Sequence, residues 1–375
     1  MYIMPRYHTN LAPTIEGWVS SKNEVSILTY TRGRNEDYSN IESVVVGYAK
    51  VFNAFYSLYV NIIKKNDPLA KNIALKIGIP PIKRTKDMIL KFSPDIVILR
   101  EKNLYSIVCT AICRALRIKT ILYNQSPLFN YQEKLNRDFI HRIVDKLTPT
   151  KRITPVYKIG DSDIGLVRDK NAIFAPFVMP VSVAPSEKKY FKNGNINILE
   201  IGKYEKRKNH LMMIDVFEKL SIGRNDLKLT IVGEKSDGFQ ENYYQNLLQE
   251  IMKRGLLDKV TLKYNLSRQE IYEEYKNTDI FVLPSTGEPA AISHIEAMSY
   301  SIPAISSSGN GTADYIINSV TGYIFEDNCE EDLQNKLSIL VNSKEKLVDM
   351  GKNAYARIDS YCNFRRYQEA VQSLL

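Results

Sequence analysis

Short apolar runs alternate along this chain with longer segments that have helical spacing, and this alternation limits its possible folds. The apolar runs are rich in Ile, Val and Leu, and each is followed by a segment with apolar residues every three to four positions. Such alternation predicts parallel strands joined by helices that cover both faces of a sheet. The chain has 375 residues, which is too long for one ordinary core. We therefore expect an α/β protein with two doubly wound, Rossmann-like domains that face one another across a cleft.

The expected strands form two consecutive series. The amino-terminal series is expected at residues 2–4, 25–30, 95–100, 120–124 and 153–157. The carboxy-terminal series is expected at residues 196–201, 227–232, 260–264, 279–283, 304–307 and 322–325. Helices are expected between them, for example at residues 104–116, 209–220, 240–254, 268–277 and 292–300.

The segment from Val44 to Ile63 has apolar residues at helical spacing and is expected to form one helix. Lys50, Asn53 and Asn61 interrupt its apolar character. A helix with these residues is too polar to cross a membrane.

A polar stretch with two prolines separates the two series of strands. It contains Pro180 and Pro185 and has the composition of a linker. We therefore expect an amino-terminal domain over residues 1–185 and a carboxy-terminal domain over residues 186–360. Residues 361–375 have helical spacing, and this helix is expected to return to the first domain.

The four cysteines, at positions 109, 113, 329 and 362, lack the spacing of a zinc site. Cys109 and Cys113 are four residues apart in an apolar run, so we expect two buried thiols on one helix face. Sparse, unpaired cysteines fit a reducing cytoplasm. No signal peptide is visible, so the expected location is the cytoplasm.

Charge is distributed unevenly between the two halves. Residues 1–190 contain 29 Lys and Arg against 16 Asp and Glu, whereas residues 191–375 contain 22 against 26. A basic half indicates an anionic partner. The densest cluster of cations comprises Lys64, Lys65, Lys71, Lys76, Lys83, Arg84, Lys86 and Lys91. Apolar residues interleave with these cations, which favours contact with an anionic membrane surface, and nucleic acid or plain solvent exposure are the alternatives.

Two glutamates, Glu288 and Glu296, follow the expected strand at residues 279–283. Eight residues of helix would rise roughly 12 Å, which exceeds the separation of a glycosidase pair of about 5–9.5 Å. The spacing is suited to two contacts with one long ligand, such as a sugar at one end and a ribose at the other, because carboxylates accept well from paired hydroxyls.

Two further segments follow strands of the same domain. Residues 202–209 read Gly-Lys-Tyr-Glu-Lys-Arg-Lys-Asn, so a glycine turn and several cations precede a helix. That combination is typical of a diphosphate site. Residues 306–314 are rich in Ser and Gly and could present backbone N–H groups to an anion, but they lack the third glycine of a dinucleotide-binding motif. All three segments are expected at one edge of the sheet.

With these motifs, residues 196–326 resemble the retaining group-one glycosyltransferases of family four, which have the two-domain GT-B fold. The resemblance includes the stretch from Gly202 to Asn209, the pair Glu288 and Glu296, and Gly322. The family transfers a sugar from a nucleotide diphosphate donor with retention of configuration and without a bound metal. It implies no cofactor.

The resemblance also implies roles for individual residues. Lys203 and Lys208 would hold the donor diphosphate, Glu288 would contact the sugar and act with them in catalysis, and Glu296 would contact the ribose. Cations at the leaving diphosphate are physically sensible, since charge develops there in the transition state. The donor-binding residues implied in addition are Gly202, Asn209, Pro289, Ala291, Ile292, Gly309, Asn310, Gly311 and Thr312, the last four through backbone amides.

The amino-terminal half matches the family only loosely. The family's glycine-rich turn after the first strand is replaced by residues 5–10, which include His8 and Asn10, and its usual histidine is replaced by Asn124 and Gln125. We expect these four residues on the acceptor side. In the other half, Ala290, Ala291, Ser301 and Asn310 replace an aromatic-glycine pair and two glycines, which alters the expected sugar pocket.

Three smaller features have simple structural interpretations. Asp161 and Asp163 resemble a metal-binding DxD motif but lack its strand-end context. His294 lies between the two key glutamates and is expected to be packed. Trp18 is expected in the core of the first helix.

The preferred hypothesis is a cytoplasmic glycosyltransferase at the inner face of the plasma membrane. The resemblance implies a uridine diphosphate sugar as donor and a lipid-linked or glycan acceptor in capsule or lipopolysaccharide assembly, with no nucleic-acid partner. The alternatives are a non-catalytic nucleotide-sugar-binding partner of another transferase, a sugar-nucleotide epimerase and a nucleic-acid-binding protein.

Overall fold

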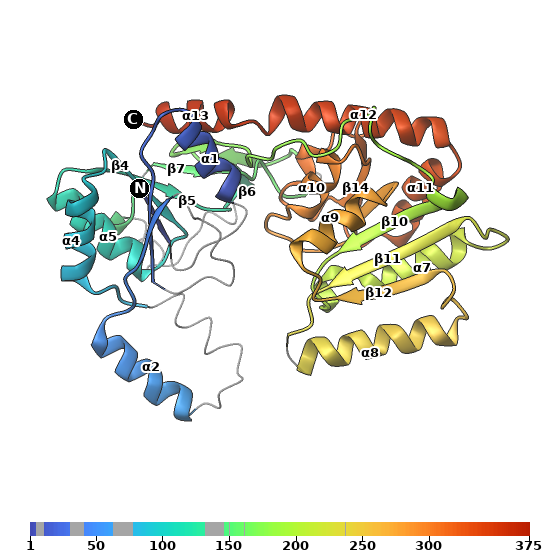
Figure 1. Cartoon of the computed structure of the whole chain (residues 1–375), viewed down its shortest axis with the longest axis horizontal. Coiled ribbons are helices and arrows are strands. Elements are labelled where there is room, and N and C mark those ends of the chain that lie inside the picture. The colour runs from blue at the N-terminus through green and yellow to red at the C-terminus, as the bar shows by residue number, and fades with distance from the viewer. Residues whose placement is uncertain are drawn as a thin grey trace. The chain divides into compact units, whose positions relative to one another are not determined.

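The computed structural model describes two compact units (Figure 1). The residues that it describes are 1–4, 11–30, 41–62, 78–131, 146–149, 151–160, 162–236 and 238–375. The amino-terminal unit comprises Met1–Pro155, Gly165–Val178 and Phe364–Leu375. The carboxy-terminal unit comprises Val156–Ile164 and Met179–Asn363.

The chain passes between the units four times, whereas the expected boundaries at residues 185 and 360 give two passages. Residues 179–185 already belong to the carboxy-terminal unit. Their backbone is bonded into it, because the Met179 N–H donates to the Cys362 carbonyl (2.8 Å) and the Ser182 N–H donates to the Ser299 carbonyl (2.9 Å). The two prolines therefore lie inside a unit, and hydrogen bonding rather than composition sets the boundary.

All strands of the amino-terminal sheet are parallel. Their order is β3 (Glu42–Val45), β2 (Ser26–Thr29), β1 (Tyr2–Met4), β4 (Ile96–Arg100), β5 (Lys119–Tyr123), β7 (Arg152–Thr154) and β9 (Ala172–Phe174). The order reverses between β1 and β4, which is the switch point of a doubly wound sheet.

Strand β3 corrects one prediction. Val44 and Val45 belong to β3, and helix α2 (Lys50–Ile62) begins only after Gly47, whose φ is +78°. Three consecutive valines favour a strand, and the left-handed glycine ends it. Strand β9 and the antiparallel pair of β6 (Phe129–Tyr131) and β8 (Leu166–Arg168) were also not predicted, because each has only three residues.

Two layers of helices cover the amino-terminal sheet. On one face, α4 (Ile82–Phe92) and α5 (Leu104–Ala115) contribute to a core that includes Cys109 and Cys113, so both thiols are buried as predicted. On the other face, α1 (Ala12–Ser20) lies against α13 (Phe364–Gln372).

The contact between α1 and α13 includes the single tryptophan. The Trp18 ring packs edge-on against Phe364 with ring centroids 5.0 Å apart, and its Nε1 donates to the Tyr2 hydroxyl (2.8 Å). Trp18 is half-buried at this helix contact and does not lie in the core.

The carboxy-terminal sheet is also entirely parallel. Its order is β12 (Val260–Tyr264), β11 (Leu227–Gly233), β10 (Ile196–Ile201), β13 (Ile280–Leu283), β14 (Ala304–Ser307) and β15 (Gly322–Phe325). The order reverses between β10 and β13, so the crevice beyond these two strand ends is where a doubly wound sheet binds its ligand.

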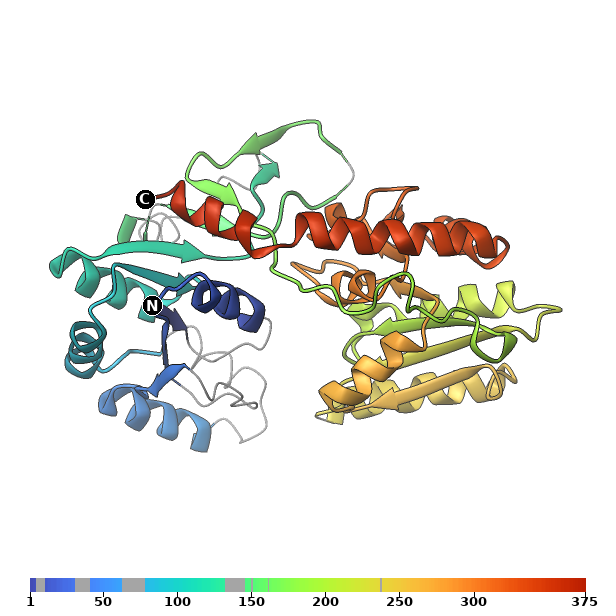
Figure 2. The ribbon, with the colours of Figure 1, turned by 45° about the horizontal axis from the view of Figure 1, so that its top comes forward.

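The helices of this unit range in length from seven to 18 residues. They are α7 (His210–Leu220), α8 (Gly238–Lys253), α9 (Arg268–Lys276), α10 (Ser293–Ser299), α11 (Glu330–Val341) and α12 (Lys344–Tyr361). Figure 2 shows α12 followed, after a short connection, by α13, with which the chain returns to the amino-terminal unit.

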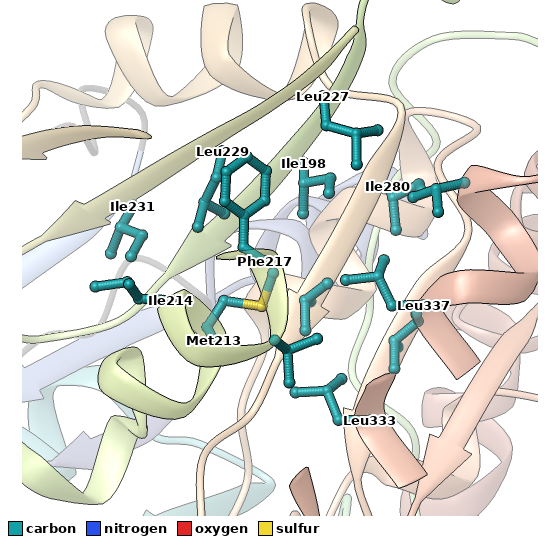
Figure 3. Close-up of a cluster of buried hydrophobic side chains, with 14 of the residues drawn as sticks. Ile198, Met213, Ile214, Phe217, Leu227, Leu229, Ile231, Ile280, Leu333 and Leu337 are labelled. Atoms are coloured by element: carbon teal, nitrogen blue, oxygen red, sulfur yellow. The ribbon is translucent and has the colours of Figure 1, made fainter. Parts of the chain in front are cut away.

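Alternate residues of the strands explain why the carboxy-terminal sheet is covered on both faces. Ile198 and Leu229 meet Met213 and Phe217 of α7 in one buried cluster (Figure 3). On the other face, the Phe281 ring packs against Tyr275 of α9 with ring centroids 6.1 Å apart. Burial at about 25 cal/mol per Å² stabilises both layers and leaves the strand ends as the accessible edge.

Among the described residues, no helix is both long and apolar enough to cross a bilayer.

Candidate functional site

Two loops meet at the switch point of the carboxy-terminal sheet. Residues 202–209 follow β10, and residues 284–292 follow β13. The Thr286 N–H donates to the Arg207 carbonyl (2.9 Å), and the Asn209 side-chain amide donates to the Pro284 carbonyl (3.1 Å). Two motifs that are about 80 residues apart in sequence are therefore joined at one sheet edge.

The Glu288 carboxylate is held between two cations from the other loop. Its Oε2 accepts from Arg207 Nη1 (2.5 Å) and from the Lys208 ammonium. The Glu288 and Lys208 side chains are each 11% exposed, whereas Arg207 is 38% exposed. Burial alone would raise the pKa of Glu288, but Lys208 and Arg207 hold it below its usual range. The site thus combines an ionised carboxylate with two cations.

The loop at residues 202–209 depends on backbone features that the sequence shows. A Cβ at Gly202 would lie 3.0 Å from Cδ of Lys208, so the glycine leaves room for the stem of that lysine. Asn209 has a φ of +56°, a conformation that Asn tolerates, and it links a short 3₁₀ turn at Lys206–Lys208 to helix α7.

A buried histidine, His210, connects this loop to strand β10 through two hydrogen bonds. His210 Nδ1 lies 2.6 Å from Glu200 Oε1, and Nε2 lies 2.9 Å from the Lys203 carbonyl. Both His210 and Glu200 are at most 1% exposed. Since a carbonyl only accepts, Nε2 must donate to Lys203. The hydrogen bond between Nδ1 and the Glu200 carboxyl group then needs one further proton, which lies between these two atoms. The pair ties the backbone of the basic loop to strand β10.

The loop after β14 supports Glu288 from its other side. The Glu288 N–H donates to the Gly309 carbonyl (3.2 Å), and the Gly311 N–H donates to the Glu288 carbonyl (2.9 Å). A Cβ at Gly311 would lie 2.1 Å from the Pro289 carbonyl oxygen, so only glycine permits this approach.

The backbone amides of residues 309–312 are used within the fold, which corrects the expectation that they are offered to phosphate. The N–H of Gly309 donates to Ser307 Oγ and that of Thr312 to Asn310 Oδ1. The Asn310 N–H donates to the Ser307 carbonyl, and the Gly311 N–H is taken by Glu288. The loop therefore positions Glu288, and its amides have acceptors already.

The side-chain hydrogen bonds of Asn310 explain why this position, which is usually glycine in the family that the sequence resembles, is asparagine here. It is 1% exposed, and its Oδ1 accepts from the Ala291 N–H (3.3 Å) and from the Thr312 N–H (3.2 Å). Thr312 Oγ1 also lies 2.7 Å from the Ala291 carbonyl, to which it donates. Ser301, the other replaced glycine, keeps a positive φ of +59° and donates from Oγ to the Val183 carbonyl (2.7 Å).

Glu296 has a different environment from Glu288. Its Oε2 accepts from the Tyr275 hydroxyl (3.1 Å), and its Oε1 lies 3.6 Å from Arg268 Nη2. Burial raises the pKa of Glu296, and Arg268 and Tyr275 offset only part of that effect. Helix α10 begins at Ser293, so Glu288 lies in the loop before it, and the eight-residue helical separation does not apply.

The other predicted donor residues are distributed around this site. Lys203 is half-exposed and pairs with Glu234 at 3.2 Å, so it does not share the contact of Lys208 with Glu288. Pro289 is exposed, Ala291 is buried and Ile292 is half-buried. These residues flank Glu288 along the same loop.

His294 is fully buried, as predicted. Its Nε2 lies 2.9 Å from the Thr312 carbonyl, and its Nδ1 has no partner among the described residues. Burial lowers the pKa of His294 to about 4, so the ring is neutral and its Nε2 carries the proton that Thr312 accepts.

Arg207 is the site residue that sequence reasoning missed. It lies between Lys206 and Lys208 in a run of three cations. The short 3₁₀ turn formed by these residues determines which of the three side chains contact Glu288. Lys206 is exposed.

The predicted acceptor-side residues lie in the amino-terminal unit or outside the described residues. His8 and Asn10 are outside them, as is Asp161 of the DxD-like sequence. Asn124 uses its Oδ1 to accept from Arg152 Nη1 (3.0 Å), and Gln125 is exposed.

The second aspartate of the DxD-like sequence has an ordinary surface environment. Asp163 is 82% exposed and pairs with Lys158 at 2.7 Å. In the described part of the chain, no three His, Cys, Asp or Glu side chains are close enough together to hold a metal ion.

The carboxy-terminal half matches a known family. Residues 185–357 match the family model for glycosyl transferases group 1, and this segment contains the three loops described above. The chain is 27% identical over 187 residues to spore coat protein SA of Bacillus subtilis (strain 168), which is 49% of this chain and 48% of that protein.

A second relative has a similar extent. The capsular polysaccharide biosynthesis glycosyltransferase CapM of Staphylococcus aureus is 24% identical over 195 residues, 50% of this chain and 48% of that protein. The chain thus spans about half the length of the curated relatives that it matches.

Solved structures align over the whole chain. HepE of Anabaena, solved with UDP and glucose, has a TM-score of 0.71 at 12% identity over 100% of this chain and 99% of that chain. TarM of Staphylococcus aureus has a TM-score of 0.68 at 13% identity, with 100% and 99% coverage. At this identity the likeness shows the fold alone, and it confirms two α/β domains with parallel sheets.

Proposed function

We propose that this chain is a glycosyltransferase that transfers a sugar from a nucleotide diphosphate donor to an acceptor. The observation that carries the proposal is the contact of Glu288 with Arg207 and Lys208 at the switch point of the carboxy-terminal sheet. The match of residues 185–357 to group 1 glycosyl transferases supports it.

The chemistry of the site fits departure of a nucleoside diphosphate. Negative charge grows on the diphosphate as the glycosidic bond breaks, and fixed cations in a partly buried site stabilise that charge most. Lys208 is the better placed cation, since it is 11% exposed, and Arg207 can add a bidentate contact. Glu288 would then face the hydroxyls of the sugar.

The finer assignments follow from the sequence resemblance and from the names of the similar proteins. The donor would be a uridine diphosphate sugar, the configuration would be retained, no metal would be required, and Glu296 would contact the ribose. The acceptor would be lipid-linked or a polysaccharide, as in capsule or lipopolysaccharide assembly. HepE binds UDP in its crystal structure, and CapM is named for capsular polysaccharide, which supports these choices.

The amino-terminal unit supports a place at the inner membrane surface. Helix α4 exposes Lys83, Lys86 and Lys91 together with Ile82 (58% exposed) and Leu90 (50% exposed). Cations beside exposed apolar side chains suit an anionic bilayer. Lys64, Lys65, Lys71 and Lys76 of the predicted cluster lie outside the described residues.

A panel of nucleotide sugars tests the proposal. Purified protein is incubated with uridine, guanosine and adenosine diphosphate sugars, and binding is measured by calorimetry and turnover by release of free nucleotide. We expect one donor to bind and Lys208→Ala to lower release by about 10²–10³.

Lys206→Ala is the matched control, because Lys206 belongs to the same run of cations but is exposed. It should retain most of the release. Equal losses in Lys206→Ala and Lys208→Ala, or no binding of any nucleotide sugar, would rule the proposed site out.

A further inference from the structure

Arg100 is a buried cation at the carboxyl end of the central strand of the amino-terminal sheet. It is the last residue of β4 and is 6% exposed. Strand β4 lies beside β1, where the strand order of this sheet reverses. Arg100 is therefore at the edge where a doubly wound sheet binds ligands.

Within the described residues, the guanidinium of Arg100 has few partners for a buried charge. Its Nε is buried without a hydrogen-bond partner there. One cation–π contact, with the Tyr123 ring at 4.4 Å, faces it. A single aromatic face compensates only a small part of the desolvation of a guanidinium.

A second arginine in the same sheet, Arg152, has the full set of hydrogen bonds that is expected of a buried arginine with a structural role. Arg152, on β7, is also 6% exposed. Its nitrogens donate to Asp169 Oδ2 (2.9 Å), Asn124 Oδ1 (3.0 Å) and two carbonyl oxygens at 2.8 Å. Within the described part of the chain, one buried arginine of this sheet is thus fully hydrogen-bonded, whereas the other, at the switch point, has a buried Nε without a hydrogen bond.

We propose that Arg100 binds an anionic group of the acceptor substrate, a phosphate or a carboxylate. The planar guanidinium suits bidentate contact with either oxyanion, and it cannot lose its charge to relieve burial. The excess of Lys and Arg in residues 1–190 would attract such a substrate. The assignment to the acceptor rests on the proposed function, whereas anion binding by Arg100 does not.

The first test compares Arg100→Met with Arg152→Met by thermal unfolding of the full chain without added anion. Methionine has a similar length and no charge. An unpaired buried charge is a liability for stability, so Arg100→Met should raise the melting temperature by about 2 °C or more. Arg152→Met should lower it, because the ion pair with Asp169 and the other hydrogen bonds of Arg152 are lost. A lower melting temperature for Arg100→Met would show a structural role and overturn the proposal.

The second test measures anion binding with the donor site occupied. Pyrophosphate, orthophosphate and glucuronate are titrated into UDP-saturated protein by calorimetry. We expect at least one of them to bind, with Arg100→Met about ten- to hundredfold weaker and Arg152→Met much less affected. Tighter binding of the phosphates or of glucuronate identifies the acceptor group. Absence of binding by the wild type, or equal binding by Arg100→Met, overturns the proposal.

The two proposals fail separately. If UDP does not bind at all, the donor site is wrong, and the anion titration can still be read without it. If UDP binds and Arg100→Met changes nothing, the Arg100 proposal fails and the donor site stands.

Discussion

Charged side chains lie at the carboxyl ends of strands in both sheets, beside the same kind of reversal in strand order. In the carboxy-terminal unit these charges form ion pairs, as Glu288 does with Arg207 and Lys208. In the amino-terminal unit Arg100 contacts an aromatic ring, and its buried Nε has no partner among the described residues. The contrast teaches that one edge holds its charges in ion pairs, whereas the other holds a cation for which the described residues supply no anion.

The largest expected effect tests whether the carboxy-terminal network depends on mutual pairing. His210→Ala leaves Glu200 buried without its partner, and we expect the free energy of unfolding to fall by about 3–5 kcal/mol in urea denaturation.

The double variant Glu200→Leu/His210→Leu removes both polar groups together. It should recover most of that loss, since a buried pair can be replaced by apolar residues at little cost. A single variant that loses less than about 1 kcal/mol would contradict the paired network.

The next effect concerns His294 of the same unit, whose buried Nδ1 has no hydrogen-bond partner among the described residues. Burial lowers its pKa to about 4 from an ordinary value of 6.5, so the folded state favours the neutral ring. Its contribution is fully present above pH 6.5 and is lost as the pH falls toward 4, by at most about 3 kcal/mol.

Stability against pH should therefore fall less steeply between 6.5 and 4 in His294→Gln, whose amide can still donate to Thr312. Identical slopes in the two proteins would exclude His294 as the titrating group. Comparing the two slopes removes the contributions of Asp279 and Glu296, whose raised pKa values act in the opposite direction.

A third prediction sharpens the role of the loop after β14. Gly311→Ala places a Cβ against the Pro289 carbonyl oxygen, and we expect a loss of about 1–3 kcal/mol of stability together with weaker UDP binding. Gly238→Ala is the control, because a Cβ there would meet nothing within 4 Å. Similar behaviour of the two variants would show that the loop does not position Glu288.

The smallest expected effect tests whether the Glu288 carboxylate competes with a bound diphosphate for Arg207 and Lys208. Glu288→Gln frees Arg207 and Lys208 from their carboxylate, so UDP should bind about three- to tenfold more tightly while transfer is lost. Isothermal calorimetry measures the change in affinity. Unchanged or weaker UDP binding would mean that Glu288 does not compete with the diphosphate.

The sequence predicted much of the carboxy-terminal unit because its motifs follow long apolar strands. Glu288 and Lys208 each stand a few residues after such a strand, and parallel strands bring their ends together. Arg207 was missed because its two neighbours are also cations, and the 3₁₀ turn that selects it depends on Asn209 and on the loop after β13.

The amino-terminal unit was harder to predict for physical reasons. Strands β3 and β9 are short, and three or four residues give no clear periodicity. Arg100 ends an apolar strand without any motif around it, so its isolation is visible only once the neighbouring side chains are placed.

The return of the chain to the amino-terminal unit has a consequence for biosynthesis. The hydroxyls of Tyr2 and Tyr367 are 3.2 Å apart, although the residues are separated by 365 positions in sequence. A ribosome therefore completes the sheet of the first unit long before it delivers α13, which covers one of its faces. The amino-terminal unit is thus the first to be synthesised and the last to be completed. Until α13 is available, the apolar face around Tyr2 and Trp18 is uncovered and can associate with other chains.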